Sequence, residues 1–414
     1  MKSLTTQMAW RNVWRNPRRS VLTMSAVAFA ALVLIFMLSW QFGSYETMIN
    51  SAVAVHSGHL QVQAEGYLKK RGMRRVVKHP EEVTRIIARI PEVKAFTTRA
   101  CAFSLTSSDK RSYAALVVGI DPAREPEVST LKTLVRRGAF LAPDDRHQAL
   151  LGRLLARNLK VGLGDEIVLL GQGRDGSIAA SAVRVKGIFS SGQDEFDRST
   201  LQIPLAAFQE IYAMGGAVHE VVIRGRGLEV VPRIEAAVSS GLANAKAGDG
   251  LVVLDWKELM PGLVQSIQMD LVSGLVFYVI LIVVVAFSIL NTFLMAVFER
   301  KKEFGVLMAL GSKPNRLSAM ILTECGLMTG LGIGAGILLG SIVTLYYQAH
   351  GIAFSGSSEV LRQFGLPERM YPELSLLSIA AGAGVVLIIT SFAVVYPALR
   401  VRRLRPVEAL AAPQ

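Results

Sequence analysis

Residues Phe298–Gly311, FERKKEFGVLMALG, form a short charged segment between two long apolar runs. The runs are Leu271–Val297 and Leu317–Tyr347, and each exceeds the ~20 residues that cross the hydrocarbon core of a bilayer as a helix. The segment is therefore predicted to turn the chain round between two transmembrane helices. The helical spacing of its apolar residues favours a short helix along the membrane surface that contacts a partner, and a solvated loop that carries only charge is the alternative.

The charges around this segment predict the topology. Residues 299–316 hold five basic and two acidic residues, which places them in the cytoplasm by the positive-inside rule. Two further apolar runs, Ser20–Phe42 and Leu374–Leu399, lie next to basic ends: residues 1–19 carry five basic and no acidic residues, and residues 400–414 carry four basic and one acidic. Four spans with both termini in the cytoplasm satisfy every cluster. The run at 20–42 is too long for a signal peptide.

Composition agrees with a mixed architecture. The 414 residues are 51% hydrophobic and 19% charged, with a mean hydropathy of +0.40, which is too apolar for a typical soluble protein and too charged for a wholly membrane-embedded one. Most of the net charge of +13 lies beside the apolar runs. It is therefore expected to orient the chain and attract anionic lipid headgroups rather than nucleic acid.

The domain boundaries follow from these runs. We expect an amphipathic cytoplasmic interfacial helix at 1–19, with Trp10 and Trp14 toward lipid, and transmembrane helices at 20–42, 271–298, 317–347 and 374–399. The connecting parts are an extracytoplasmic domain at 43–270, a cytoplasmic helix at 299–316, an extracytoplasmic loop at 348–373 and a cytoplasmic tail at 400–414.

The 43–270 region has globular patterning and is predicted to be a large α+β domain of two lobes, with a β-rich insertion at about 121–216. Alternating and β-branched runs predict strands, among them 95–106, 112–120, 182–189 and 220–224, and apolar residues at helical spacing predict helices at 80–90, 148–159, 204–214 and 228–242. The predicted fold class is thus a membrane α-helical protein with four transmembrane helices and this extracytoplasmic domain.

Polar and small residues inside the apolar runs are candidates for helix contacts. Glu324 lies about two turns into its run, and an acid at that depth either faces the helix bundle, with Asn291 as a candidate partner, or extends to the interface. Gly332, Gly336 and Gly340 repeat every four residues, a pattern typical of close helix packing.

Catalytic and metal motifs are weak. Gly305 and Gly311-Ser312-Lys313 have the wrong spacing for a phosphate loop. We interpret His56 and His59 as surface histidines rather than metal ligands, and Asp194, Glu195 and Asp197 as a solvated loop. Cys101 and Cys325 fall in different regions, so no disulfide or zinc site is expected. The chain is therefore predicted to be non-catalytic.

Three stretches carry a family resemblance. Ala9–Ser20 (AWRNVWRNPRRS), Glu299–Leu317 (ERKKEFGVLMALGSKPNRL) and Tyr396–Leu410 (YPALRVRRLRPVEAL) resemble the opening, the E-R-x-x-E-[IF]-G-x-x-x-A-[LI]-G signature and the ending of the FtsX-like/MacB-like permeases of ABC transporters, the mechanotransmission type. Glu324 falls where the family often has an acid. The layout without a fused ATPase most resembles lipoprotein-releasing system permeases.

The resemblance implies a bacterial inner-membrane permease whose 299–311 segment is a coupling helix on a separate ATPase dimer. The implied contact residues are Glu299, Arg300, Glu303, Phe304, Gly305, Leu307, Leu310 and Gly311. ATP and Mg²⁺ would lie on that partner, with no cofactor on this chain. Further implied partners are a second permease subunit, identical or a sister, and a periplasmic chaperone or adaptor. The implied function is extraction or export of lipoprotein or another amphipathic substrate; the alternative is signalling to an extracytoplasmic partner such as a cell-wall hydrolase, without transport.

Overall fold

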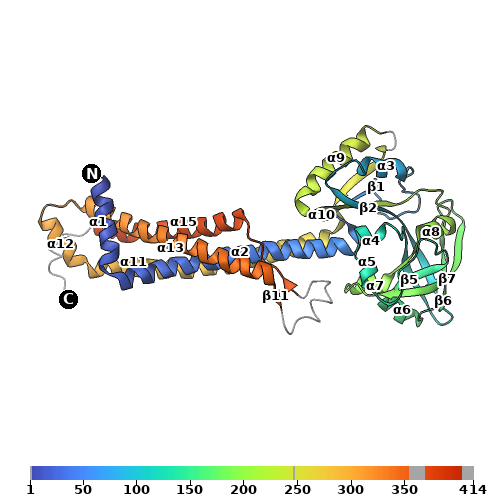
Figure 1. Cartoon of the computed structure of the whole chain (residues 1–414), viewed down its shortest axis with the longest axis horizontal. Helices are drawn as coiled ribbons and strands as arrows, with labels where there is room; N and C mark the ends of the chain where they lie inside the picture. The colour runs from blue at the N-terminus through green and yellow to red at the C-terminus, as the bar shows by residue number, and fades with distance from the viewer. Residues whose placement is uncertain (1, 246–247, 354–368, 403–414) are drawn as a thin grey trace. The chain divides into compact units, whose positions relative to one another are not determined.

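The computed structural model describes residues 2–245, 248–353 and 369–402, and the chain divides into two compact units (Figure 1). Among the described residues, the membrane unit comprises 2–45, 267–353 and 369–402, and the sheet unit comprises 46–245 and 248–266. Each unit has its own hydrophobic core, and each is described by itself below.

The membrane unit is built mainly of helices. They are α1 (Lys2–Arg15), α2 (Pro17–Ala52), α11 (Pro261–Glu299), α12 (Lys301–Ala309), α13 (Pro314–His350) and α15 (Leu376–Arg402), with a short hairpin of β11 (Ile352–Ala353) and β12 (Arg369–Met370). Four of the described helices are long and apolar enough to cross a membrane, as predicted. Pro17 and Pro314 start α2 and α13, where the missing amide proton of proline costs nothing. The 36 residues of α2 reach about 54 Å, so this helix continues well beyond a ~30 Å hydrocarbon core.

Helix α13 approaches α2 through its glycines. A Cβ atom on Gly332 would lie 2.9 Å from the Met24 carbonyl oxygen, and one on Gly336 would lie 2.6 Å from that of Ala28. Gly340 lies against Leu32 in the same way, with 3.2 Å to its Cα. The three glycines therefore let the two backbones pack closely. Helix α1 also packs inward, because Ala9 and Val13 are fully buried while Trp10 and Trp14 are about half exposed.

The sheet unit is built on one ten-stranded sheet. The strands are β1 (Leu60–Ala64), β2 (Val93–Ser107), β3 (Ser112–Ile120), β4 (Val135–Gly138), β5 (Gln148–Gly152), β6 (Glu166–Gln172), β7 (Ile178–Phe189), β8 (Thr200–Pro204), β9 (Glu220–Gly225) and β10 (Leu251–Asp255). Their order is β10-β1-β9-β2-β3-β8-β5-β7-β4, and β6 pairs with β2 and β7. The pairs β3·β8 and β5·β7 are parallel and the rest are antiparallel, so the sheet is mixed.

Two main cores lie on this sheet. Around β1 and β9 the core is closed by α3 (Pro80–Ile87) and α9 (Val231–Ala243), and around β5–β8 it is closed by α6 (Arg153–Leu159) and α8 (Leu205–Ile211). The short helices α4 (Glu125–Val128), α5 (Leu131–Leu134), α7 (Asp194–Ser199) and α10 (Trp256–Leu259) complete the unit. Strand β2 belongs to both halves, because its residues 93–99 pair with β9 and its residues 99–107 pair with β3. The predicted α+β fold class is confirmed, with a continuous sheet through both lobes.

One predicted helix is wrong in its first half. Residues 148–159 form strand β5 followed by α6 rather than one helix. Ala149, Leu150 and Leu151 are all fully buried, because β5 lies in the interior of the sheet between β7 and β8. A run that is buried on both faces has no alternation, so its pattern does not distinguish strand from helix.

Candidate functional site: a charge network beside helix α12

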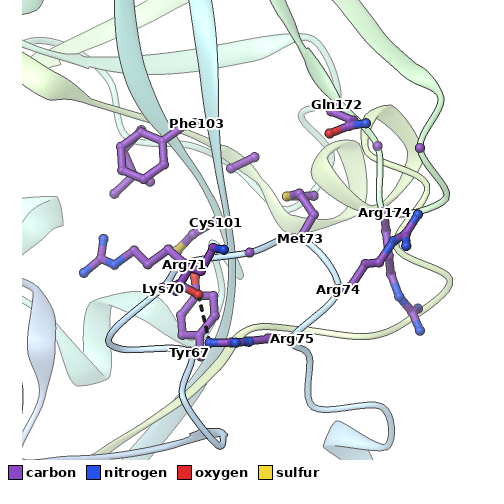
Figure 2. Close-up of a pocket in the computed structure, with 15 residues that line it drawn as sticks. Tyr67, Lys70, Arg71, Met73, Arg74, Arg75, Cys101, Phe103, Gln172 and Arg174 are labelled. Carbon is purple, nitrogen blue, oxygen red and sulfur yellow. Dashed lines mark hydrogen bonds between the residues drawn. The ribbon is translucent and has the colours of Figure 1, made fainter.

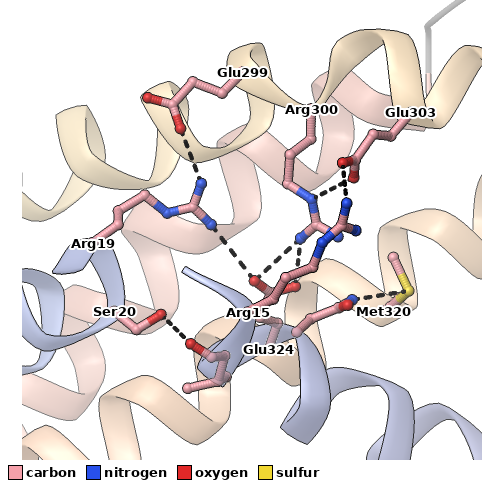
Figure 3. A network of polar contacts seen from close by, with 10 residues as sticks. Arg15, Arg19, Ser20, Glu299, Arg300, Glu303, Met320 and Glu324 are labelled. Atoms are coloured by element: carbon pink, nitrogen blue, oxygen red, sulfur yellow. Dashed lines mark hydrogen bonds and ion pairs between the residues drawn. The ribbon is translucent and has the colours of Figure 1, made fainter. Parts of the chain in front are cut away.

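Six charged side chains form one continuous network where α1, α2, α11, α12 and α13 meet (Figure 3). The signs alternate along it, in the order Glu299, Arg19, Glu324, Arg300, Glu303, Arg15. Three arginines face three glutamates, so the network is neutral as a whole. Each ion lies beside an opposite charge, which offsets the cost of removing it from water.

Glu324 is the buried centre of this network. Its side chain is 5% exposed, and its two carboxylate oxygens accept hydrogen bonds of 3.2 and 2.9 Å from Nη1 of Arg300. Arg19 adds a second cation, 3.7 Å from Glu324 Oε1. Glu324 therefore faces the bundle and does not extend to the interface. Asn291 is exposed, so the structure contradicts its candidate pairing with Glu324.

Arg300 occupies the junction between α11 and α12. Its Nε donates to Glu303 at 3.1 Å, its Nη1 donates to Glu324, and its guanidinium lies 5.6 Å from the centroid of the Phe304 ring. One side chain thus joins the end of α11, the first turn of α12 and the N-terminal third of α13. The turn between the transmembrane helices is fixed by these bonds.

The other two acids of the network are more exposed than Glu324. Glu299 and Glu303 have side chains that are 54% and 41% exposed, and they pair with Arg19 and Arg15 at 3.1 and 3.0 Å. The interaction of such exposed pairs is weakened by solvent and contributes at most ~1 kcal/mol each. Stability should therefore rest mainly on the Glu324–Arg300 pair.

Helix α12 has a buried and an exposed face. Phe304, Gly305 and Met308 are buried against the bundle. Val306 is 49% exposed and Leu310 is 78% exposed, and Gly311 follows with a φ of +92°, which ends the helix. Lys302 and Ala309 are exposed on the same side, which gives a partly apolar surface with one cation.

The residues that the sequence predicts for a partner contact lie on both sides of α12. Phe304 and Gly305 are buried against the bundle, and the Arg300 side chain is 12% exposed, so these three face away from the exposed side of α12. Leu310 and Gly311 are exposed, Glu299 and Glu303 lie in the network with part of each carboxylate exposed, and Leu307 is half-buried. Lys302 and Val306 were not predicted. The sequence could have indicated them, because 302, 306 and 310 follow one another at intervals of four residues and therefore share one face of a helix.

Arg15 and Arg19 were also missed as partners of the signature glutamates. In the sequence they are almost 300 residues away from Glu299 and Glu303, and their positive charge was interpreted only as a topology signal. In the structure each of them binds a glutamate of the 299–303 segment. The charge at the N-terminus thus has a structural role as well.

Three interpretations in the sheet unit are wrong for one reason, namely burial. His59 is buried and its Nδ1 accepts a 3.0 Å hydrogen bond from the Gly225 amide, while His56 is half-buried beside Arg99. Asp197 is fully buried and accepts from Ser191 N at 2.8 Å and Ser191 Oγ at 2.7 Å, so it is not part of a solvated loop. Within residues 2–245, 248–353 and 369–402, no group of three or more potential metal ligands occurs, and both cysteines are free.

Comparison with known proteins agrees with this architecture. Residues 20–241 match the family model of the MacB-like periplasmic core domain, and residues 275–406 match that of the FtsX-like permease C-terminal region. The chain is 26% identical over 318 residues to a lipoprotein-releasing system transmembrane protein LolC of Xylella fastidiosa, covering 73% of this chain and 74% of the relative. It is 22% identical to the LolC of Neisseria meningitidis serogroup B, covering 96% and 95%.

The chain is also similar to MacB proteins. The chain is 25% identical over 268 residues to a macrolide export ATP-binding/permease protein MacB of Rhodospirillum rubrum, which covers 64% of this chain and 38% of that protein. The crystal structure of the periplasmic region of MacB from Actinobacillus actinomycetemcomitans covers 52% of this chain and 94% of its own, with 13% identity and a TM-score of 0.38. With a family model that matches 222 residues of the 414, this chain belongs to the ABC transporter permeases of the FtsX-like type with a MacB-like periplasmic core domain.

Proposed function

We propose that this chain is the membrane subunit that receives motion from a separate cytoplasmic ATPase through helix α12. The observation that carries the proposal is the division of α12 into two faces. The buried face and the charge network fix α12 to α1, α2, α11 and α13, and the opposite face presents Lys302, Val306 and Leu310. Displacement of α12 by a partner would therefore move the ends of several transmembrane helices together.

The exposed face has the chemistry of a contact surface. Leu310 and Val306 are large apolar side chains that are exposed beside a cation, and such residues form the core of many interfaces. A partner would bury both without removing any ion of the network from its present pairing. The network would then serve to transmit the displacement, and the exposed face would serve to bind.

The orientation that this role requires follows from charge. With residues 299–316 in the cytoplasm, both termini are cytoplasmic and the sheet unit is periplasmic. We expect a reporter fused at Ala142 to be detected on the periplasmic side and one fused at Lys313 on the cytoplasmic side. The reverse pattern would contradict the proposed orientation, and ATPase docking on α12 with it.

We propose the lipoprotein-releasing type of assembly, because two relatives with that printed name align with 73% and 96% of the chain. The substrate would be a lipoprotein or another amphipathic molecule. A second permease subunit would pack along α11, whose most apolar window is only 6% buried within this chain. In a bilayer such a helix can contact lipid or a subunit, so a pull-down must identify the partner.

The docking role is tested by the double variant Val306→Glu/Leu310→Glu in the full chain. Both residues are exposed, so the chain should still insert and fold, whereas an ATPase should no longer co-purify in mild detergent. The control is Val306→Ala/Leu310→Ala, which shortens the same side chains without adding charge and should retain more of the partner. Equal ATPase recovery with the glutamate variant and the unmodified chain would contradict docking on this face.

The same purification separates transport from signalling. Recovery of an ATPase with a similar permease, together with ATP-dependent release of lipoprotein from proteoliposomes, would support the transport assignment. Recovery of an ATPase without such release, and with a cell-wall hydrolase bound to the periplasmic domain, would support the signalling alternative.

A further inference from the structure

A basic pocket lies in the sheet unit and shares no residue with the charge network (Figure 2). Its volume is about 590 Å³, which is within the range of small-molecule sites. The walls are formed by the loop that follows β1, by β2 and by the turn between β6 and β7. The pocket therefore combines three segments of one unit and does not depend on the placement of the two units.

Five cations line this pocket and no carboxylate does: Lys70, Arg71, Arg74, Arg75 and Arg174. None of the five forms an ion pair within the described part of the chain. Five unpaired like charges around one cavity repel one another, and a bound anion would offset that repulsion. Arginine is also the residue best suited to bind phosphate or carboxylate in a bidentate manner.

Hydrogen bonds hold the basic loop, residues 67–75, in place. Arg75 Nη1 donates to the Gly66 carbonyl, and an isolated bridge between Val77 and Val218 fixes the end of the loop to the sheet unit. Arg174 Nη1 donates to the Met214 carbonyl at 2.6 Å. Two of the five cations therefore hold the walls. The side chains of Lys70, Arg71 and Arg74 make no hydrogen bond to the described part of the chain and remain available to a ligand.

The floor of the pocket is apolar and aromatic. Tyr67 and Cys101 are buried there, and the Tyr67 hydroxyl has no conventional hydrogen-bond partner among the described residues. Burial raises the pKa of the Cys101 thiol. Arg71 lines the same pocket as Cys101. Glu220, whose charge reaches Cys101, is buried and does not line the pocket.

An exposed apolar strip leads away from the cations. Phe103 lines the pocket and is 62% exposed, and Leu105, two residues further along the same face of β2, is 43% exposed. Leu105 is paired in register with Leu170 of β6, which is 46% exposed. Ile178, the register partner of the pocket residue Gln172, is 81% exposed. Cations at one end and uncovered apolar side chains at the other match a molecule with an anionic head and an apolar body.

We propose that this pocket and strip bind an anionic amphiphile, with a phosphate or carboxylate group among Lys70, Arg71 and Arg74 and an apolar chain along Phe103, Leu105 and Leu170. This site is independent of the ATPase contact on α12. It is also distinct from the transmembrane helices, because all of its residues belong to the sheet unit. Its charge complementarity selects an anion, and the strip distinguishes an amphiphile from a free anion.

The test uses the full chain in nanodiscs of zwitterionic lipid, without ATPase, and three probes. The probes are dihexanoyl phosphatidylglycerol, dihexanoyl phosphatidylcholine and inorganic phosphate, each titrated below its micelle concentration where that applies. We expect phosphatidylglycerol to bind at least about tenfold more tightly than either other probe, a difference that one lost charge-assisted contact accounts for.

Matched variants assign the binding to the pocket. Arg71→Glu/Arg74→Glu should weaken phosphatidylglycerol binding by about tenfold or more, and Phe103→Ser should weaken it without changing the binding of phosphate. The control, Arg85→Glu/Arg89→Glu, makes the same charge change at two exposed arginines of the same unit that do not line the pocket. It should bind phosphatidylglycerol like the unmodified chain.

Three results would overturn the proposal. Equal binding of phosphate and phosphatidylglycerol, unaffected by Phe103→Ser, would show a site for a free anion. Equal loss in the control and the pocket variant would show only a general effect of charge. No binding of phosphatidylglycerol above that of phosphatidylcholine would show that the pocket does not recognise the anionic head. Because no ATPase is present, none of these results bears on docking at α12.

Discussion

The Glu324 carboxylate on α13 accepts a 2.9 Å hydrogen bond from the Arg300 guanidinium at the start of α12, and both side chains are largely buried. We expect Glu324→Gln to destabilise the membrane unit by roughly 3 kcal/mol, because it leaves Arg300 and Arg19 without their shared counter-ion. Thermal unfolding in detergent measures this. The double variant Glu324→Gln/Arg300→Gln should recover part of the loss, and additive losses would contradict direct coupling.

The glycines of α13 provide a test with an internal control. Gly336→Ala should destabilise the contact with α2, because the new Cβ would lie 2.6 Å from both the Ala28 carbonyl oxygen and the Ala31 Cβ. Overpacking of this kind costs about 1–3 kcal/mol. Gly334→Ala meets nothing within 4 Å and should be neutral or slightly stabilising, since alanine favours the helix. Thermal unfolding of both variants in detergent compares them, and equal behaviour would contradict the close packing.

In the acidic cluster at 194–197, Asp197 should be needed for the stability of the fold and Asp194 should not. Asp197→Ala removes a buried carboxylate that accepts from Ser191 N and Ser191 Oγ, and we expect a loss of about 2–3 kcal/mol. Asp194→Ala removes a side chain that is 47% exposed. Its carboxylate lies 4.0 Å from the Arg153 guanidinium, a long and weak ion pair, so the effect should stay within about 0.5 kcal/mol. Chemical denaturation of the full chain compares the two. A larger loss for Asp194→Ala would contradict this assignment.

Acid should destabilise the sheet unit through His219. Burial lowers the pKa of His219 from 6.5 to about 4, and its Nδ1 accepts a 3.0 Å hydrogen bond from the Cys101 amide. Between these values the unfolded chain binds a proton that the folded chain does not, so stability falls as the pH falls. The loss reaches about 1.4 kcal/mol per pH unit and roughly 3 kcal/mol in total.

Unfolding temperatures from pH 7 to pH 4 test this prediction. His219→Asn keeps an acceptor near the Cys101 amide but cannot take up the proton, so it should show a shallower decline with acid than the unmodified chain. His56 and His59, whose pKa values are also lowered by burial, should contribute to the remaining slope. An unchanged slope in His219→Asn would contradict the role of His219.

The sequence alone predicted the four long apolar helices of the membrane unit, because a bilayer imposes a minimum length on every span. Leu271–Val297 and Leu317–Tyr347 could only be long helices, and the basic segment between them had to be a turn. Glu324 could be identified as unusual from its position alone. Its partners could not, since Arg19 and Arg300 approach it only after three helices have packed.

The sheet unit shows where sequence patterns lose information. Residues 148–152 are buried on both faces, so their apolar run has no period, and only the pairing with β7 and β8 identifies a strand. The basic pocket was missed for a different reason. Residues 69–78 contain six basic and no acidic residues, but a charge total over the whole domain cancels them against acids elsewhere. A local count would have located the loop, but not the pocket that it forms with β2.

Strand β2 has a mechanical consequence. Its first half is hydrogen-bonded to β9 and its second half to β3, so one uninterrupted backbone of fifteen residues carries both lobes. To separate the lobes, a load along this strand would have to break a whole row of hydrogen bonds in shear at the same time, rather than one after another. The periplasmic domain should therefore respond to a pull as a single stiff body, and its lobes should not open like a hinge.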